Sequence, residues 1–97
     1  MRYIKSLTLR VPTDDITCVA FSLDGNLIAS GFCNIVRVWR VDTGHVLHNL
    51  IADKSVSSIA WGPGHCLFCG LESGYLICWT LDEAKQVFLF RRRLSHV

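Results

Sequence analysis

The chain carries one pattern twice, about forty residues apart, and each copy ends on a tryptophan. The first copy runs from Ile16 through Gly31 to Trp39, and the second runs from Val56 through Gly70 to Trp79. A period of about 40 residues is the signature of a repeat architecture, in which one unit cannot bury its own faces. The sequence therefore predicts units that stack on one another or on partners.

Short apolar runs, rich in β-branched and aromatic residues and separated by turn residues, predict strands throughout. We expect strands at residues 3–9, 16–21, 27–31, 35–39, 46–50, 56–61, 66–70, 75–79 and 86–90. The runs at 16–21 and 27–31 are apolar on both faces, which is typical of a sheet that is covered on both sides. The pattern predicts an all-β fold of antiparallel sheets, with four strands in each unit.

Four segments of the first copy match the pattern of the WD-repeat family: Phe21–Gly25, Leu27–Gly31, Val36–Trp39 and Asp42–Gly44. The chain resembles this family over nearly its whole length. The resemblance implies two blades of an incomplete WD-type β-propeller, a fold of four-stranded blades around a central channel. It also implies a rigid platform for protein–protein contacts that has no chemistry of its own.

The chain departs from the family pattern at several positions. Arg40 and Thr80 stand where the family has the aspartate of its Trp-Asp pair, and both Gly-His pairs are missing. Asn34 and Ser73 correspond to the family's buried turn aspartate. The resemblance therefore implies that the His–Ser/Thr–Trp hydrogen-bond network is incomplete, and that these blades are less stable than consensus ones.

The resemblance also divides the chain into an outer strand of a preceding blade (1–10), repeat one (about 11–44), repeat two (about 45–85) and a trailing outer strand (86–97). Each blade face has a footprint of about 300 Å², from four strands of about five residues. Two uncovered faces would expose roughly 600 Å², at or above the largest patch of a typical monomer. We expect a fragment, a truncated gene product, or a protomer that self-associates to complete a propeller.

Composition excludes several classes of protein. A net charge of +2 does not argue for nucleic acid or membrane binding, and no apolar run approaches the ~18 residues of a membrane span. Five cysteines do not suit a closed disulfide framework, so reduced thiols in the cytoplasm or nucleus are expected. No catalytic constellation is found, and neither enzymatic activity nor a cofactor is expected. His45 and His48 are expected at the surface.

Two further motifs offer alternative functions. Arg91–Arg93, the only charge run, could bind nucleic acid or membrane phosphates, although such a run more often protects a solvated strand edge. Cys66 and Cys69, with His65 and Cys78 nearby, could form a zinc or thiol-redox module. However, residues i and i+3 of a strand point to opposite faces, so small buried cysteines are the expected outcome. Cys18, Cys33 and Cys78 are likewise expected to fill space in apolar sheets.

Partner contacts in the WD-repeat family often use the loops that lead into the inner strand and those between the second and third strands. The resemblance maps this surface onto Phe32, Asp14, Asp15, Lys54 and Glu72. Phe32 is the strongest candidate, because an aromatic side chain in an exposed tight turn can anchor a partner. The alternative is that Phe32 covers the neighbouring blade.

Overall fold

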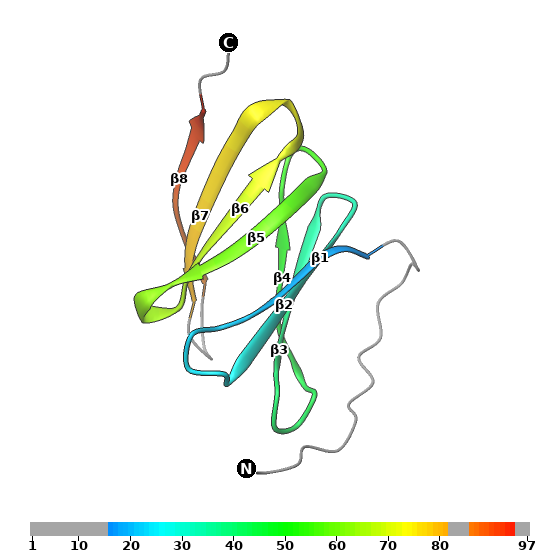
Figure 1. The fold of residues 1–97 in the computed structure, drawn as a ribbon, viewed down its shortest axis with the longest axis vertical. Coiled ribbons are helices and arrows are strands. Elements are labelled where there is room, and N and C mark those ends of the chain that lie inside the picture. Colours follow the sequence, from blue (N-terminus) through cyan, green and yellow to red (C-terminus); the bar gives the residue numbers. More distant parts are fainter. Residues whose placement is uncertain (1–15, 82–85, 95–97) are drawn as a thin grey trace.

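The computed structural model describes residues 16–81 and 86–94, and these form two antiparallel sheets of four strands. Blade 1 contains β1 (Ile16–Phe21), β2 (Leu27–Phe32), β3 (Ile35–Arg40) and β4 (Val46–Ile51). Blade 2 contains β5 (Val56–Gly62), β6 (Cys66–Leu71), β7 (Tyr75–Leu81) and β8 (Gln86–Arg93). In each blade the strands are neighbours in chain order (Figure 1). The predicted fold class is therefore confirmed.

The predicted strands from residue 16 onward are all present, most of them one or two residues longer than expected. The expected turn at 62–65 contains a short 3₁₀ turn at Pro63–His65, and the turn at 71–74 contains another at Glu72–Gly74. The expected strand at 3–9, the outer strand at 1–10 and most of the turn at 81–85 lie outside the described residues.

Turn chemistry explains how blade 1 begins. In the β1–β2 turn, Asp24 Oδ1 accepts hydrogen bonds from the Ser22 hydroxyl at 2.7 Å and from the Asn26 amide at 2.9 Å. Gly25 follows with a φ of +77°, a left-handed conformation that glycine adopts without steric cost. The Asp-Gly pair therefore fixes the reversal that the sequence predicted.

The two blades are repeats in their irregularities as well as in their strands. Each inner strand has a bulge near its start, at Thr17 in β1 and at Ser57 in β5. Each outer strand has another, at Leu47 in β4 and at Leu89 in β8. The pairing registers make positions of the two blades equivalent, so that Phe21 corresponds to Trp61 and Leu50 corresponds to Arg92.

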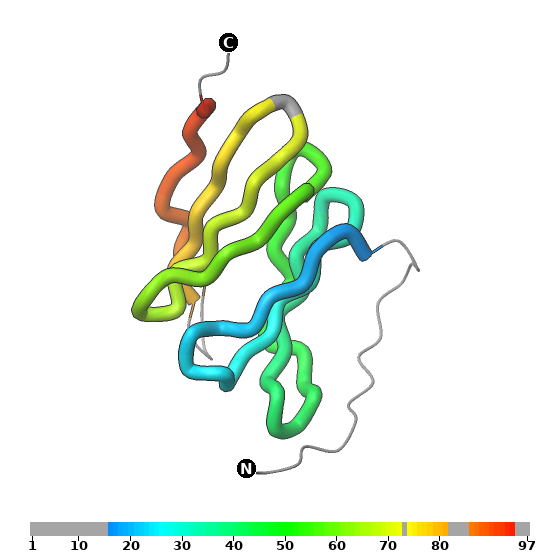
Figure 2. The backbone as a smooth tube through the Cα atoms, viewed as in Figure 1, coloured from blue at the N-terminus to red at the C-terminus, as the bar shows by residue number. Residues whose placement is uncertain are grey.

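The hydrophobic core lies between the blades, with β5 packed beside β1 (Figures 1 and 2). Fully buried side chains come from both sheets, among them Val36, Val38 and Leu50 of blade 1 and Leu67 and Cys69 of blade 2. Each blade thus buries one face against the other, which is why neither repeat could form a core alone.

Two polar contacts fix β5 against blade 1. Trp61 is 9% exposed, and its Nε1–H donates to the Ala20 carbonyl at 3.0 Å. The Thr17 hydroxyl donates to the Val56 carbonyl at 2.8 Å. Because both acceptors are backbone carbonyls, these bonds set the register of one blade on the other without requiring a particular partner side chain.

The face of blade 1 that points away from blade 2 is only partly covered. Val56, Ile59 and Trp61 of β5 pack into the core. Their equivalents in β1 are exposed: Ile16 by 47%, Val19 by 57% and Phe21 by 59%. The apolar residues expected on both sides of this strand are present, but one side meets solvent. This agrees with the expectation that a two-blade stack leaves apolar surface at its ends.

One buried polar atom, the Ser30 hydroxyl oxygen, lacks a described hydrogen-bond partner. Ser30 on β2 is 1% exposed, and its hydroxyl has no hydrogen-bond partner among the residues that the structure describes. Leaving a buried hydroxyl unpaired costs roughly 1–3 kcal/mol. The unpaired Ser30 hydroxyl is consistent with the incomplete hydrogen-bond network that the resemblance implies, part of which falls outside the described residues.

Two expectations about exposure are wrong. His48 was expected at the surface, but it is 6% exposed within β4, opposite the core residue Val38. Cys33 was expected to fill space in a sheet, but it lies exposed in the β2–β3 turn with a φ of +53°. In both cases the residue type suggested an environment, and its position along the sheet decided otherwise.

Candidate functional site

Three connections lie together at one end of the blades, the upper end in Figure 1, and we name them the loop rim. They are the β2–β3 turn (33–34), the β4–β5 loop (52–55) and the 3₁₀ turn Glu72–Gly74. Backbone hydrogen bonds join them in sequence: Val56 N donates to Cys33 O, Glu72 N to Ser55 O, and Leu94 N to Gly74 O, at 2.7–2.9 Å. The loop rim is therefore a continuous surface rather than three independent loops.

Asn34 reinforces the loop rim within blade 1. Its side-chain amide donates to the Ala52 carbonyl at 2.9 Å, and its own carbonyl accepts the Ala52 amide at 2.7 Å. The residue corresponds to the turn aspartate of the WD-repeat pattern. Here its amide group holds the β4–β5 loop directly.

The predicted site residues have different outcomes. Lys54 and Glu72 are exposed on the loop rim, on loops joined through the Ser55 carbonyl. Phe32 is not in an exposed turn, and that expectation is wrong: it is the last residue of β2 and is 2% exposed. Asp14 and Asp15 lie outside the described residues. Of the predicted residues that the structure describes, Lys54 and Glu72 are the accessible ones.

Phe32 is buried because the strand continues one residue beyond the predicted end. It pairs with Ile16 on one side and with Ile35 on the other, and the Arg37 guanidinium lies 5.6 Å from its ring centre. A ring held between two strands and under a guanidinium supports the loop rim from below. Phe32 therefore supports the loop rim by packing beneath it and does not itself offer an exposed contact to a partner.

The arginine run does not form one cationic surface, because successive residues of a strand point to opposite faces. Arg91 lies over the Tyr75 ring at 3.6 Å and pairs with Asp53 at 2.9 Å, and Arg93 lies 5.7 Å from the same ring. Arg92 pairs with Leu76 on the other face and is exposed. This division weakens the alternative of a phosphate site made by Arg91, Arg92 and Arg93 together.

The cysteines show no convergence on a metal. Cys69 is fully buried and Cys66 is half-buried, in agreement with the expected filling role, and burial raises the pKa of the Cys69 thiol to about 12. Burial also raises the pKa of the Cys78 thiol. Within residues 16–81 and 86–94, no group of three or more potential metal ligands comes together. A thiol with a raised pKa is a poor nucleophile near neutral pH.

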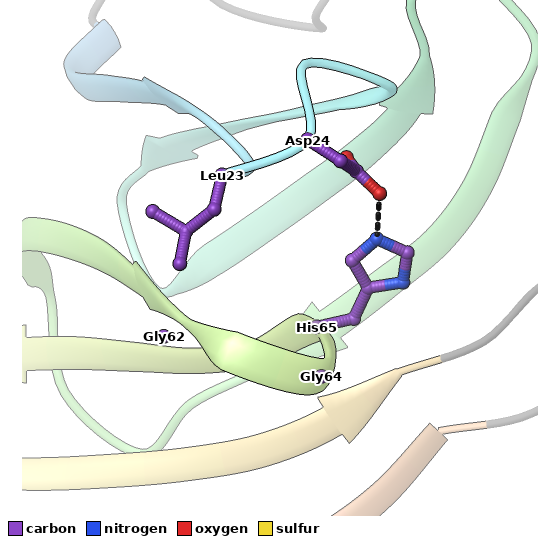
Figure 3. Close-up of a pocket in the computed structure, with 5 residues that line it drawn as sticks. All are labelled: Leu23, Asp24, Gly62, Gly64 and His65. Carbon is purple, nitrogen blue, oxygen red and sulfur yellow. Dashed lines mark hydrogen bonds and ion pairs between the residues drawn. The ribbon is translucent and has the colours of Figure 1, made fainter.

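A pocket of about 230 Å³ lies at the opposite end of the blades, where the β1–β2 turn meets the β5–β6 turn. Its lining consists of Leu23, Asp24, Gly62, Gly64 and His65. Figure 3 shows the His65 ring directed at the Asp24 carboxylate, and Nε2 lies 2.9 Å from Oδ2. The Asn26 amide, then the Ser22 hydroxyl and His65, lower the pKa of Asp24 to about 2.

Ser22, Asp24 and His65 are the residue types of a hydrolase triad, but their connections differ. Asp24 stands between the other two, whereas a triad places the histidine between the serine and the carboxylate so that it can take the serine proton. The Ser22 side chain is buried, and it accepts the Leu27 amide at 3.0 Å. The arrangement builds a turn and a contact between blades.

Sequence reasoning missed the contacts between the blades. The Trp61–Ala20 and His65–Asp24 bonds each join residues 41 positions apart, close to the repeat period. An alignment of the two repeats could have indicated the Trp61 contact, because Trp61 stands at the position that Phe21 occupies in the first repeat and adds an N–H donor there. The Arg91–Tyr75 stack left no comparable signal.

The chain is similar in sequence to known proteins. The family model described as "WD domain, G-beta repeat" matches residues 4–40. The chain is 32% identical over 65 residues to Meiotic fizzy-related protein 1 of Schizosaccharomyces pombe, and this match covers 64% of the chain and 15% of that protein. It is 34% identical over 62 residues to Ribosome biogenesis protein bop1-A of Xenopus laevis, covering 62% of the chain and 8% of that protein.

Solved structures show the same fold. A chain of the crystal structure of the Mitotic Checkpoint Complex matches with a TM-score of 0.73 at 20% identity, over 82% of this chain and 27% of that one. The structure of U3-55K matches with a TM-score of 0.75 at 22% identity, over 87% and 28%. The computationally designed Ika4 protein matches with a TM-score of 0.69 at 22% identity, over 81% and 49%.

Two four-stranded blades that share a core define part of a β-propeller built from repeats. The matched family model explains the repeat pattern of the sequence: the chain carries a WD repeat at residues 4–40, and the WD-repeat family is the one that the matches support. The chain spans less than a sixth of the length of the two curated relatives described above.

Proposed function

We propose that this chain serves as a non-catalytic scaffold for protein–protein interaction, and that the loop rim is its docking surface. The observation that carries the proposal is the hydrogen-bonded loop rim, which presents Lys54 and Glu72 to solvent above a buried core. A preformed surface binds with a small loss of conformational entropy, which is what a scaffold requires. Asp14 and Asp15 are proposed as further contacts of the same surface.

Further blades belong to this proposal. The exposed side of β1 carries Ile16, Val19 and Phe21, and its equivalent in β5 packs into the core between the blades. Another blade, from the same polypeptide or from a second copy that self-associates, would cover this side. Light scattering of the chain at several concentrations distinguishes a discrete assembly from a monomer.

The proposed location is the cytoplasm or the nucleus. All five cysteines are free thiols, which suits a reducing compartment. Within the described ranges, no helix is long and apolar enough to cross a membrane. We propose no nucleic-acid or phosphate-binding function for the arginine run, because Arg91 is engaged with Asp53 and Tyr75.

The loop rim is tested by site-specific photocrosslinking. A benzophenone side chain placed at position 54 or 72 should capture the same discrete protein from cell extract, and the purified protein should then bind the chain directly. The same group at Thr43, exposed in the turn at the opposite end of blade 1, is the matched control. The adduct formed from position 54 should disappear in the Glu72→Lys background, and the adduct formed from position 72 should disappear in the Lys54→Glu background.

The opposite pattern would reject the proposed surface. Capture from Thr43 with none from positions 54 and 72, or capture that is unchanged by the two charge reversals, would place the partner elsewhere. Circular dichroism of each variant keeps a folding defect from being mistaken for lost binding, and exposed loop positions usually change stability by less than about 0.5 kcal/mol.

A further inference from the structure

The outer strand of blade 2 differs from the outer strand of blade 1 in charge and in exposed apolar surface. β8 has eight residues and ends on three arginines, whereas β4 has six residues and no lysine, arginine, aspartate or glutamate. Val87, Phe88 and Leu89 in the first half of β8 are 44%, 53% and 48% exposed. The strand therefore has an apolar half followed by a cationic half.

β8 is also an edge strand, because it is the last strand of its sheet and, among the described strands, pairs with β7 alone. The backbone groups on its free side form a template to which an extended peptide can add. The bulge at Leu89 interrupts the pairing, but Phe90–Arg93 pairs with Tyr75–Cys78 in an unbroken register. The cationic half of β8 is thus the regular part of the edge.

The two halves of β8 are held differently. Its end is fixed, because the Leu94 amide donates to the Gly74 carbonyl at 2.7 Å and Arg91 pairs with Asp53. Phe88 rests against the Trp79 ring, with a centroid separation of 5.9 Å. Arg92 is exposed on the other face, next to Leu76. A strand that is fixed on one side and open on the other is organised for strand addition.

We propose that the free edge of β8 binds an extended peptide of a partner protein, in which acidic residues come first and apolar residues follow. The order results from antiparallel addition: the peptide would run from Arg93 toward Gln86, so its first residues lie beside the arginines and its later ones beside Val87–Leu89. A carboxylate opposite Arg92 is a cross-strand pair of opposite charge, which stabilises an antiparallel pair.

A peptide fits this edge better than a polyanion does. A phosphate chain would need the arginines on one side, but Arg92 points away from Arg91 and Arg93, which lie at the Tyr75 ring. A phosphate chain also leaves the exposed apolar half of β8 without a partner. A peptide strand, with side chains on alternate faces, meets both charge positions and the apolar residues.

The test uses three synthetic peptides: one with glutamates followed by valine and threonine residues, one with the same composition in reverse order, and one with glutamine in place of glutamate. Fluorescence anisotropy gives their dissociation constants at low and high salt. We expect the first to bind about fivefold more tightly than either of the others, from one or two favourable cross-strand pairs. High salt should reduce this advantage.

Protein variants locate the site. Arg92→Glu should weaken binding of the first peptide about fivefold. Lys54→Glu, a matched reversal of an exposed cation on the loop rim, should leave the affinity unchanged, which also separates this surface from the proposed docking rim. Hydrogen exchange should show slower exchange of amides within residues 86–93 when the peptide is bound, because strand addition pairs the free backbone groups.

Three results would overturn the proposal. Equal affinity for the forward and reversed peptides would mean that charge alone attracts them. Binding without slower exchange in β8 would place the peptide elsewhere. Tighter binding of a short oligonucleotide or of polyphosphate than of the first peptide, lost in Arg92→Glu, would assign the edge to phosphate recognition. Because the Arg92 side chain is exposed, the Arg92→Glu variant should remain folded, and circular dichroism checks this.

Discussion

Substitution of Trp61 can measure how much the contact between the two blades contributes to the free energy of unfolding. Trp61 is 9% exposed in the core between the sheets, and its indole N–H donates to the Ala20 carbonyl of the other blade at 3.0 Å. Trp61→Phe keeps an aromatic ring in place but removes this donor. The substitution therefore tests the contact between blades without removing the whole side chain.

The expected cost has two parts. A typical intramolecular hydrogen bond contributes about 0.5–1.5 kcal/mol to stability. Loss of the second ring removes roughly 40 Å² of buried apolar surface, or about 1 kcal/mol at 25 cal/mol per Å². Together they lower the free energy of unfolding by about 2 kcal/mol, which in a domain of this size lowers the melting temperature by roughly 10 °C.

Urea and thermal unfolding, followed by circular dichroism at low protein concentration, measure this cost. Phe21→Leu is the matched control, because Phe21 occupies the equivalent position in β1 but is 59% exposed. It should change the free energy of unfolding by less than about 0.5 kcal/mol. The reasoning is refuted if the two substitutions cost the same, or if Trp61→Phe costs less than about 0.5 kcal/mol.

Three other predictions concern single side chains. The pKa of Asp24 is lowered to about 2, first by the Asn26 amide, so its contribution to stability is present above about pH 4 and is lost as the pH falls toward 2. The melting-temperature difference between the wild type and Asp24→Asn should shrink across that window, and a constant difference would contradict the assignment. Cys33 is exposed, whereas burial raises the pKa of Cys69 to about 12. Mass spectrometry after alkylation at pH 8 should therefore find Cys33 modified first and Cys69 modified only in denaturant, and early labelling of Cys69 would show that the core opens. Arg91→Ala should cost about 1 kcal/mol, from the Asp53 pair and the stack on Tyr75, whereas Arg92→Ala should be neutral. Equal urea midpoints of these two variants would show that the Arg91 contacts do not stabilise the fold.

The sequence predicted the fold because its evidence is local and repeated. Alternating apolar residues predict the strands, and turn dipeptides such as Asp24–Gly25 predict the reversals. Both signals lie within a few residues of the chain. The spacing of Trp39 and Trp79 then shows that the same sheet occurs twice. The strand ends were less well predicted, since pairing with a neighbour extends a strand beyond its own pattern, as at Phe32.

The candidate site was predicted less completely. Lys54 and Glu72 were placed on a common surface by the resemblance to the WD-repeat family, whose partner contacts often use these loops. The stack of Arg91 on Tyr75 and its pair with Asp53 could not be assigned in this way, because those residues meet only after β8 has paired with β7 and blade 2 has packed on blade 1.

The sequence by itself thus determined the strands, their turns and their grouping into two repeated sheets, because those depend on side chains close together in the chain. The tertiary structure alone decided which repeated residues are buried: Trp61 packs against blade 1, whereas its equivalent Phe21 is exposed. It also decided that His65 meets Asp24. Burial and pairing depend on what lies across the interface, and no single repeat contains that information.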